Sequence, residues 1–293
     1  MARSRRLKAQ GDAFYHISSR ITGKQFLLQD PKIKNLMVST LERAACFSGV
    51  KVGAYCIMDD HFHIIVHIPA VDVDKISECE ILNRIEVLSG KKKAEYWQKR
   101  WARLLASQDI STLEAEYSRW RRRMSDLSQF VKTFKEEFRR GFNREHEYSG
   151  RLWGDRFFSS LMESEEYFSI CRAYVETNPL RAGLASEIDE YPWSTLGAAA
   201  HGSPFARECC EWMISLGYDF AGDTPQGMEW LRKRWPQISK GKLLGSCEFV
   251  TEAVSKYKQA LFSHTLRARE VVGGVYASHG YKIERALRKK GIA

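Results

Sequence analysis

Two histidines in an apolar segment have the spacing of metal ligands. His61 and His63 flank Phe62, and Ile64–Val66 follow. Side chains alternate along a β-strand, so both imidazoles project from one face and can chelate one divalent cation. His67 lies on the same face, but about 13 Å farther along at roughly 3.3 Å per residue, too far to reach the same ion. An isolated His-x-His pattern also arises by chance, so the pair needs further ligands before it indicates a metal site.

A tyrosine and an asparagine four residues apart could complete such a site. Tyr174 and Asn178 lie near the end of a predicted helix and share one of its faces. If Asn178 offers its side-chain oxygen to the ion, the Tyr174 phenol lies within a few ångström of it. A phenol is a weak nucleophile at neutral pH, and a divalent ion helps by polarising a phosphodiester. The structural alternative is a half-buried tyrosine and a helix C-cap.

The charge balance favours an anionic partner. The chain has 293 residues, with 46 Lys and Arg against 36 Asp and Glu, a net charge of +10. Nucleic acid is the commonest such partner, although a positive charge can also serve solubility alone. Hydrophobic residues make up 44% of the chain, which is enough for a packed core of one large or two small domains and excludes wholesale disorder.

The sequence predicts no membrane span and no disulfide framework. No apolar run approaches 18 residues, and the basic start of the chain has no apolar segment behind it. We therefore expect a cytoplasmic protein with no membrane partner. The seven cysteines are an odd count without a Cys-x-x-Cys pair, which favours reduced thiols.

The first half of the chain contains the elements that must position the histidines. Asp30-Pro31 predicts a helix start and Ser48-Gly49 a helix end. Asp59-Asp60 predicts a tight turn between two strands, one of which carries the histidines. The expected elements are a strand at 13–20, a helix at 31–48, and strands at 50–58 and 61–68.

A charge-dense segment from about 71 to 125 follows and has a helical pattern. It interleaves aromatic and basic residues, as in Trp120, Arg121 and Arg122. Such residues can stack on bases and neutralise phosphates. The alternative is a set of amphipathic helices whose tryptophans face a core while the arginines face solvent.

The second half of the chain contains Tyr174 and the elements that must position it. The pattern predicts a helix at 126–142 and a strand within 150–161. A further helix runs from about 164 to Asn178, where Pro179 ends it. Residues 201–293 are helical in pattern and end in a basic stretch at 282–290.

Five stretches, taken in order and spacing, resemble a known family. They are similar to the single-tyrosine members of the His-hydrophobe-His endonuclease superfamily, specifically the REP-associated tyrosine transposases. The resemblance covers about residues 1–70 and 126–195. The matching stretches are Gly11–Arg20, Ala54–Val66, Gly150–Phe157, Cys171–Gly183 and Tyr191–Ser194.

The resemblance implies an α+β fold, in which helices pack on a central antiparallel β-sheet of the ferredoxin-like type. Residues 1–200 would form the nuclease domain, with a helical insertion at about 71–125. Residues 201–293 would form a helical, basic C-terminal extension.

The resemblance also implies a reaction. His61, His63 and Asn178 would bind Mg²⁺ or Mn²⁺, and Tyr174 would attack single-stranded DNA to form a 5′-phosphotyrosine and free a 3′-hydroxyl. The substrates would be DNA hairpins from imperfect palindromes, and the protein would associate with the nucleoid. The residues expected to contact DNA are Arg3, Arg5, Arg6, Arg20 and Arg156, with Trp120, Arg121 and Arg122 from the insertion.

The chain departs from the family pattern at the turn before the histidines. Asp59-Asp60 replaces the usual Pro-Asn, and the added charge could raise metal affinity or only shape the turn. The insertion and the C-terminal region also exceed the minimal domain. The sequence does not distinguish a monomer from a dimer, nor does it give the target palindrome or the preferred metal.

Several rival functions differ in their motifs. Relaxases place the tyrosine before the histidines, and replication initiators of the nicking type carry Tyr-x-x-Lys where this chain has Thr177. Histidine-triad hydrolases need a third histidine two residues after His63. A non-cleaving DNA-binding protein and a structural RNA-binding protein remain open.

Overall fold

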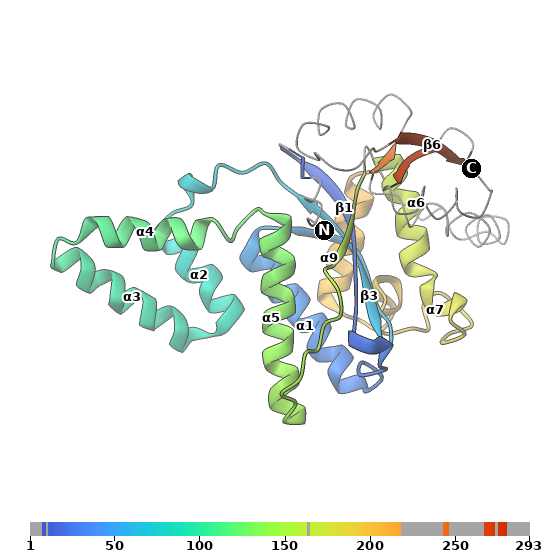
Figure 1. The fold of residues 1–293 in the computed structure, drawn as a ribbon, viewed down its shortest axis with the longest axis horizontal. Coiled ribbons are helices and arrows are strands. Elements are labelled where there is room, and N and C mark those ends of the chain that lie inside the picture. The colour runs from blue at the N-terminus through green and yellow to red at the C-terminus, as the bar shows by residue number, and fades with distance from the viewer. Residues whose placement is uncertain are drawn as a thin grey trace.

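The computed structural model confirms an α+β fold built on one mixed sheet (Figure 1). It describes residues 8–9, 11–162, 165–217, 243–245, 267–272 and 275–279. The strand order is β2-β3-β1-β4-β5-β7-β6; the first four strands are antiparallel to one another, and β4 pairs in parallel with β5. The strands are β1 Ala13–Arg20, β2 Lys51–Ile57, β3 His61–Ile68, β4 Phe158–Met162, β5 Leu243–Gly245, β6 Arg267–Val272 and β7 Val275–His279.

The predicted β2–β3 hairpin lies at one edge of the sheet, and the first strand pairs with β3. β1 pairs with β3 so that Ser18 lies opposite His63 and Arg20 opposite His61. Two residues that are paired across β1 and β3 project from the same face of the sheet. The register therefore fixes which β1 residues surround the histidines.

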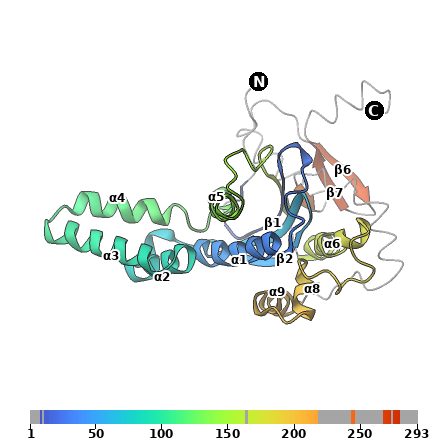
Figure 2. The same ribbon diagram turned by 90° about the horizontal axis from the view of Figure 1, so that it is seen from below.

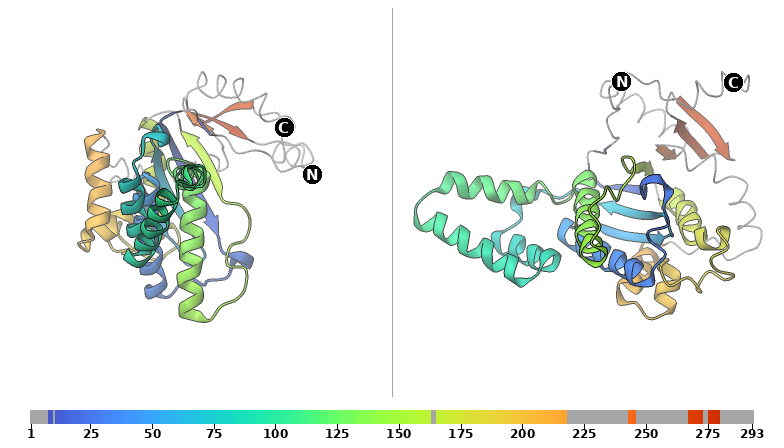
Figure 3. Two further views of the ribbon diagram at one scale, coloured as in Figure 1. Left: turned by 90° about the vertical axis from the view of Figure 1, so that its left-hand side faces the viewer. Right: turned by 60° about the horizontal axis from the view of Figure 1, so that its bottom comes forward.

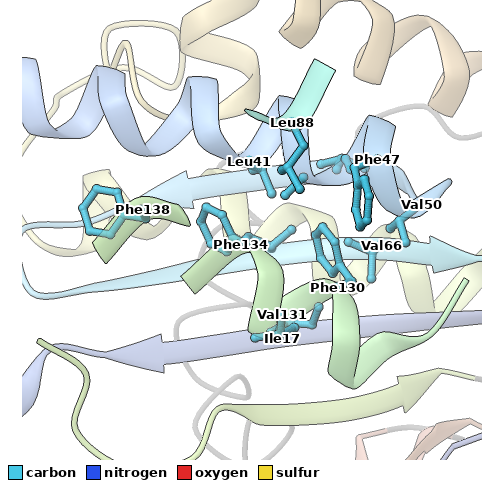
Figure 4. Packing of buried hydrophobic residues seen from close by; sticks show 14 of the residues in the cluster. Ile17, Leu41, Phe47, Val50, Val66, Leu88, Phe130, Val131, Phe134 and Phe138 are labelled. Carbon is cyan, nitrogen blue, oxygen red and sulfur yellow. The ribbon is translucent and has the colours of Figure 1, made fainter. Parts of the chain in front are cut away.

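One face of the sheet is covered by α1 (Pro31–Ser48) and α5 (Leu127–His146). Both helices begin as predicted, since Asp30 and Asp126 accept hydrogen bonds from backbone amides of their first turns. Figure 4 shows Phe130, Phe134 and Phe138 of α5 packed on the sheet beside α1. The fully buried residues of this core include Ile17, Leu41, Phe47, Val66, Phe130, Phe134 and Phe138.

The other face is covered by α6 (Glu165–Glu176), α8 (Thr195–Ala200) and α9 (Pro204–Ser215), as Figure 2 shows. A second apolar cluster joins Ile65 of β3 and Cys56 of β2 to Tyr174 and Val175 of α6. Since His63 and Ile65 project from the same face of β3, α6 packs directly over the histidine side of the sheet.

Helix α6 ends at Glu176, and a short helix α7 (Asn178–Arg181) follows with Thr177 as its cap. The prediction that Pro179 ends the helix is therefore wrong in detail. Proline is tolerated in the first turn of a helix, where its missing N–H has no intrahelical partner. The chain thus changes direction at Thr177 and resumes helical structure.

The insertion is helical as expected and forms a lobe to one side of the sheet (Figures 1 and 3). It contains one 3₁₀ turn and three longer helices, and aromatic rings pack within it, as in the Trp101–Tyr117 pair with ring centroids 4.8 Å apart. Its two ends lie close together, because Pro69–Asp72 and Ser125–Leu127 line one cavity. The elements are η2 Val73–Lys75, α2 Glu78–Ser89, α3 Lys91–Ala106 and α4 Ile110–Arg121, and η1 Thr22–Lys24 lies outside the lobe.

The C-terminal region is only partly helical, which corrects the prediction for 201–293. Helix α9 lies there, but β5, β6 and β7 extend the sheet. Alternating residues on both sides of Gly273-Gly274 form a hairpin pattern that the helical interpretation overlooked. The basic stretch at 282–290 lies outside the described residues.

None of the helices in the described part of the chain is long and apolar enough to cross a membrane. The six cysteines among the described residues are all free thiols.

Candidate functional site

The structure brings His61, His63 and Tyr174 together. The two imidazole centroids are 5.1 Å apart, and the His63 and Tyr174 ring centroids are 5.3 Å apart in an edge-to-face arrangement. The histidines come from β3, and the tyrosine comes from α6, which packs over that face of the sheet. Strand alternation and helix packing therefore place a phenol beside two imidazoles.

These three side chains line a cavity of about 500 Å³. Its walls also come from the last residues of β1, the turn after β1, and the loop before β4. That loop reaches the cavity because Gly154 N–H donates to the Arg20 carbonyl oxygen and Thr22 N–H to the Leu152 carbonyl oxygen. The other lining residues are His16, Ser18, Ser19, Arg20, Ile21, Gly23, Lys24, Gly154, Asp155, Arg156 and Phe158.

Asn178 lies next to Tyr174 but is not among the residues described as lining the cavity. Its Nδ2 donates to the Tyr174 carbonyl oxygen over 3.3 Å, and the residue is 7% exposed. The contact is the one-turn relation that the four-residue spacing predicts. A ligand role for Asn178 stays a prediction.

His16 of β1 is a site residue that the sequence analysis missed. Its Nε2 is hydrogen-bonded to His63 Nδ1 over 2.9 Å, and the rings are stacked with centroids 5.1 Å apart. Burial lowers the pKa of His16 to about 3, so the ring is neutral at physiological pH. The alternation of Phe14, His16 and Ser18 in the first strand was a partial signal: it puts these side chains on one face of β1, and the pairing with β3 makes that face the histidine face.

His61 is held by the aspartate that precedes it. His61 Nδ1 is hydrogen-bonded to Asp60 Oδ1, and Asp60 Oδ2 accepts a hydrogen bond of 3.0 Å from Arg20. Burial lowers the pKa of His61, and the Asp60 carboxylate opposes that shift. Asp60 therefore orients the imidazole through its Nδ1.

Both histidines are arranged as metal ligands usually are. Each has Nδ1 hydrogen-bonded to a neighbour, which leaves Nε2 for coordination. The pKa of His63 lies well below its ordinary value, first because of burial and then because of His16 and His61 nearby. A neutral imidazole is the form that binds a metal, so protons do not compete near neutral pH.

Asp59, the other half of the altered turn, points to a different partner. Lys34 of α1 lies 2.6 Å from its carboxylate and also donates to the Tyr191 hydroxyl over 2.8 Å. Tyr191 in turn donates to the Ile57 carbonyl oxygen over 2.7 Å. Asp59 therefore ties the turn to α1 and to the Tyr191–Ser194 motif, whereas Asp60 faces the site.

The donor set fits a divalent ion bound by two imidazoles and at least one oxygen. No group of three or more His, Cys, Asp and Glu side chains within the described residues could hold a metal ion. A third ligand would therefore come from an amide such as that of Asn178 or from a substrate phosphate. Mg²⁺ and Mn²⁺ accept such oxygen ligands, and Mn²⁺ also accepts imidazole.

Basic side chains rim the cavity. The Arg20 side chain is 49% exposed, and Lys24 and Arg156 are also exposed. The Arg181 guanidinium lies 4.9 Å from the centre of the Tyr174 ring. An anionic ligand entering this cavity would meet positive charge on several sides.

The insertion residues expected to contact DNA do not line the active-site cavity. Trp120 is 8% exposed and packs against Phe47 and Trp97, with ring centroids 5.9 and 5.4 Å away. The Arg121 guanidinium donates to the Ile76 carbonyl oxygen over 2.9 and 3.0 Å. These positions favour the structural alternative for Trp120 and Arg121. Arg122 is exposed, and Arg3, Arg5 and Arg6 lie outside the described residues.

Comparisons with known proteins give a remote likeness to solved structures. No protein-family model matches this chain, and no curated protein matches it. A solved structure of a REP-associated tyrosine transposase bound to a REP hairpin is similar over 70% of this chain and 90% of that chain. The identity is 13% and the TM-score is 0.43. The function proposed next therefore rests on the geometry of the site.

Proposed function

We propose that this protein is a metal-dependent, transposase-like endonuclease and strand transferase that acts on single-stranded DNA carrying a hairpin. The observation that carries the proposal is the convergence of His61, His63 and Tyr174 on one cavity rimmed by basic side chains. A nucleophile, a pair of neutral metal ligands and a site for an anionic substrate are the parts that phosphodiester cleavage needs.

Tyr174 is the proposed nucleophile. Its phenolic oxygen attacks the phosphorus atom, an O–P bond forms, and the bond between phosphorus and the 3′-oxygen breaks. The phenol loses its proton, and the departing 3′-oxygen gains one to become a hydroxyl. The product is a 5′-phosphotyrosine, and attack by another 3′-hydroxyl reverses the step and joins a new end.

His61, His63 and Asn178 are the residues that would hold Mg²⁺ or Mn²⁺. When bound, the ion would stabilise the charge that develops on the phosphate and on the leaving oxygen. Asp60 and His16 keep the two imidazoles oriented through their Nδ1 atoms. Arg20 and Arg156 would bind the backbone phosphates of the strand in the cavity.

Two other functions need separate consideration. A non-cleaving DNA-binding protein would use the same basic rim without the tyrosine chemistry, and a replication-initiator-type nickase would cleave without rejoining. The buried His16–His63 contact and the half-buried Asp60–His61 contact favour an active enzyme, because a protein that only binds DNA has no need for two oriented, neutral imidazoles.

The test is a search for the covalent product. The protein is incubated with single-stranded hairpin DNA and Mn²⁺ or Mg²⁺, then denatured and separated by size. We expect a denaturation-resistant protein–DNA band that needs the metal and Tyr174. Hairpin binding without such a band would favour the non-cleaving protein, and cleavage without rejoining would favour the nickase. We place this activity in the cytoplasm, in association with the nucleoid.

A further inference from the structure

One face of α5 is basic, opposite to the phenylalanine stripe that packs on the sheet. Lys132, Lys135, Glu136 and Arg139 follow the i, i+3, i+4, i+7 pattern of a single helix face. Lys132 and Arg139 are exposed, and seven residues of helix separate them by about 10 Å. The proposed DNA cleavage reaction does not account for this face.

This face is continuous with the active-site cavity. Two shallow cavities of about 370 and 420 Å³ lie along it, and both are lined by Lys135, Arg139, Trp153 and Arg156. Arg156 also lines the cavity that contains Tyr174. A strand leaving the active site past Arg156 would therefore reach α5 directly.

The other end of the face opens into a larger cleft. Lys132 and Glu136 line a cavity of about 630 Å³ between α5 and the helical insertion. Seven basic side chains and three acidic ones line this cleft, an excess of four positive charges. Two of the basic residues are paired, since Lys8 contacts Asp126 and Arg140 contacts Glu137, both at 2.5 Å.

Two other basic residues of the cleft are available for an anion. Arg119 and Lys132 are exposed, and neither forms an ion pair with any residue that the structure describes. Aromatic surface lies beside them, because half-buried Trp97 lines the cleft and Tyr96, which is 53% exposed, packs against it. The buried Trp97 Nε1 has no hydrogen-bond partner among the described residues.

We propose that the α5 track, defined as Lys132, Lys135, Arg139 and Arg156, guides single-stranded DNA from the active site to the cleft under the insertion. The proposal rests on the proposed function for the identity of the strand. Basic side chains along a path bind consecutive phosphates, and the aromatic side chains at its end offer surfaces for unstacked bases. Small cavities of 370–630 Å³ suit one strand rather than a duplex.

The experiment compares DNA substrates with different lengths of flanking strand. A hairpin is given single-stranded extensions of 0 to 20 nucleotides, and affinity is measured at several salt concentrations. The variant carries Arg119→Gln, Lys132→Gln and Arg139→Gln. The control carries Lys51→Gln and Arg207→Gln, which remove charge near α9 and line none of these cavities.

For the wild-type protein we expect affinity to rise with extension length. The triple variant should lose about tenfold or more of that gain, and its salt slope should fall by about 2, because each phosphate contact contributes about 0.7 on single strands. The control should keep the gain. A triple variant that keeps the gain, or a gain that is the same with a double-stranded extension, would overturn the proposal.

These affinities, together with the covalent-adduct assay on the same substrates, separate this proposal from the proposed function. If the triple variant loses length-dependent binding but no covalent adduct forms on Tyr174, the α5 track is supported and the proposed nuclease activity is contradicted. If a metal-dependent adduct forms but affinity does not depend on extension length, the nuclease activity is supported and the α5 track is contradicted.

Discussion

The active-site cavity and the helical insertion contain the same kinds of side chain in different environments. Around the cavity, Arg20 and Arg156 rim open space and Tyr174 lies over buried imidazoles. In the insertion, Trp120 is buried and Arg121 is fixed to a backbone carbonyl. Aromatic and basic residues that lie close in sequence therefore do not by themselves indicate nucleic-acid binding. The deciding property is whether the side chain is open to a ligand or is already used in packing and internal hydrogen bonds.

The strongest test of this difference is Tyr174→Phe. Only a hydroxyl is removed, and the ring still packs beside His63, so we expect complete loss of the covalent adduct while hairpin affinity changes less than about twofold. The measurement is the denaturation-resistant band beside a binding titration. Adduct formation by the variant would remove Tyr174 from the reaction.

Removal of the metal or its ligands should be nearly as severe. His63→Ala and treatment with EDTA should each abolish cleavage, because both act on the same ion. Added Mn²⁺ should restore the chelated wild-type protein but not the variant. Cleavage that persists in excess EDTA would show that the histidines serve another purpose.

Trp120→Ala should affect stability rather than DNA binding. The indole is buried against Phe47 and Trp97, so its loss should lower the free energy of unfolding of the insertion by about 3–5 kcal/mol. Urea denaturation measures this change. If the variant keeps its stability and loses affinity for single strands, Trp120 belongs with the active-site aromatics after all.

The smallest predicted effects separate the two aspartates of the altered turn. Asp60→Asn should weaken metal binding about 10–100-fold, because Asp60 orients His61. Asp59→Asn removes the same charge one residue away and is the matched control. It should leave metal affinity in place and cost about 1–3 kcal/mol of stability, because Lys34 keeps a buried charge with a weaker partner. Equal metal affinities in the two variants would show that Asp60 has no special role.

Local patterns were sufficient for much of the fold. Helix α1 begins at Asp30-Pro31 and ends before Gly49, as predicted. Gly49 adopts the left-handed conformation, with φ of 66°, that favours glycine at a helix end. The Asp59-Asp60 turn and strand alternation also placed His61 and His63 on one face. These features depend on neighbours in sequence, so the sequence alone could indicate them.

Features that depend on long-range pairing were missed. His16 joins the site only because β1 pairs with β3, and nothing within the first strand alone shows which strand it will pair with. Trp120 could be assigned to a core only once Phe47 of α1 was known to lie against it. The strands after residue 240 were overlooked because the surrounding pattern was interpreted as helical.

The two ends of the insertion line one cavity, so the lobe joins the sheet through a narrow neck. An evolutionary gain or loss of the lobe would need changes at only two neighbouring backbone junctions, and β1, β3 and α6 could stay as they are. Relatives could thus exchange the lobe while keeping the same sheet. The ancestry of the lobe and that of the sheet should therefore be traced separately.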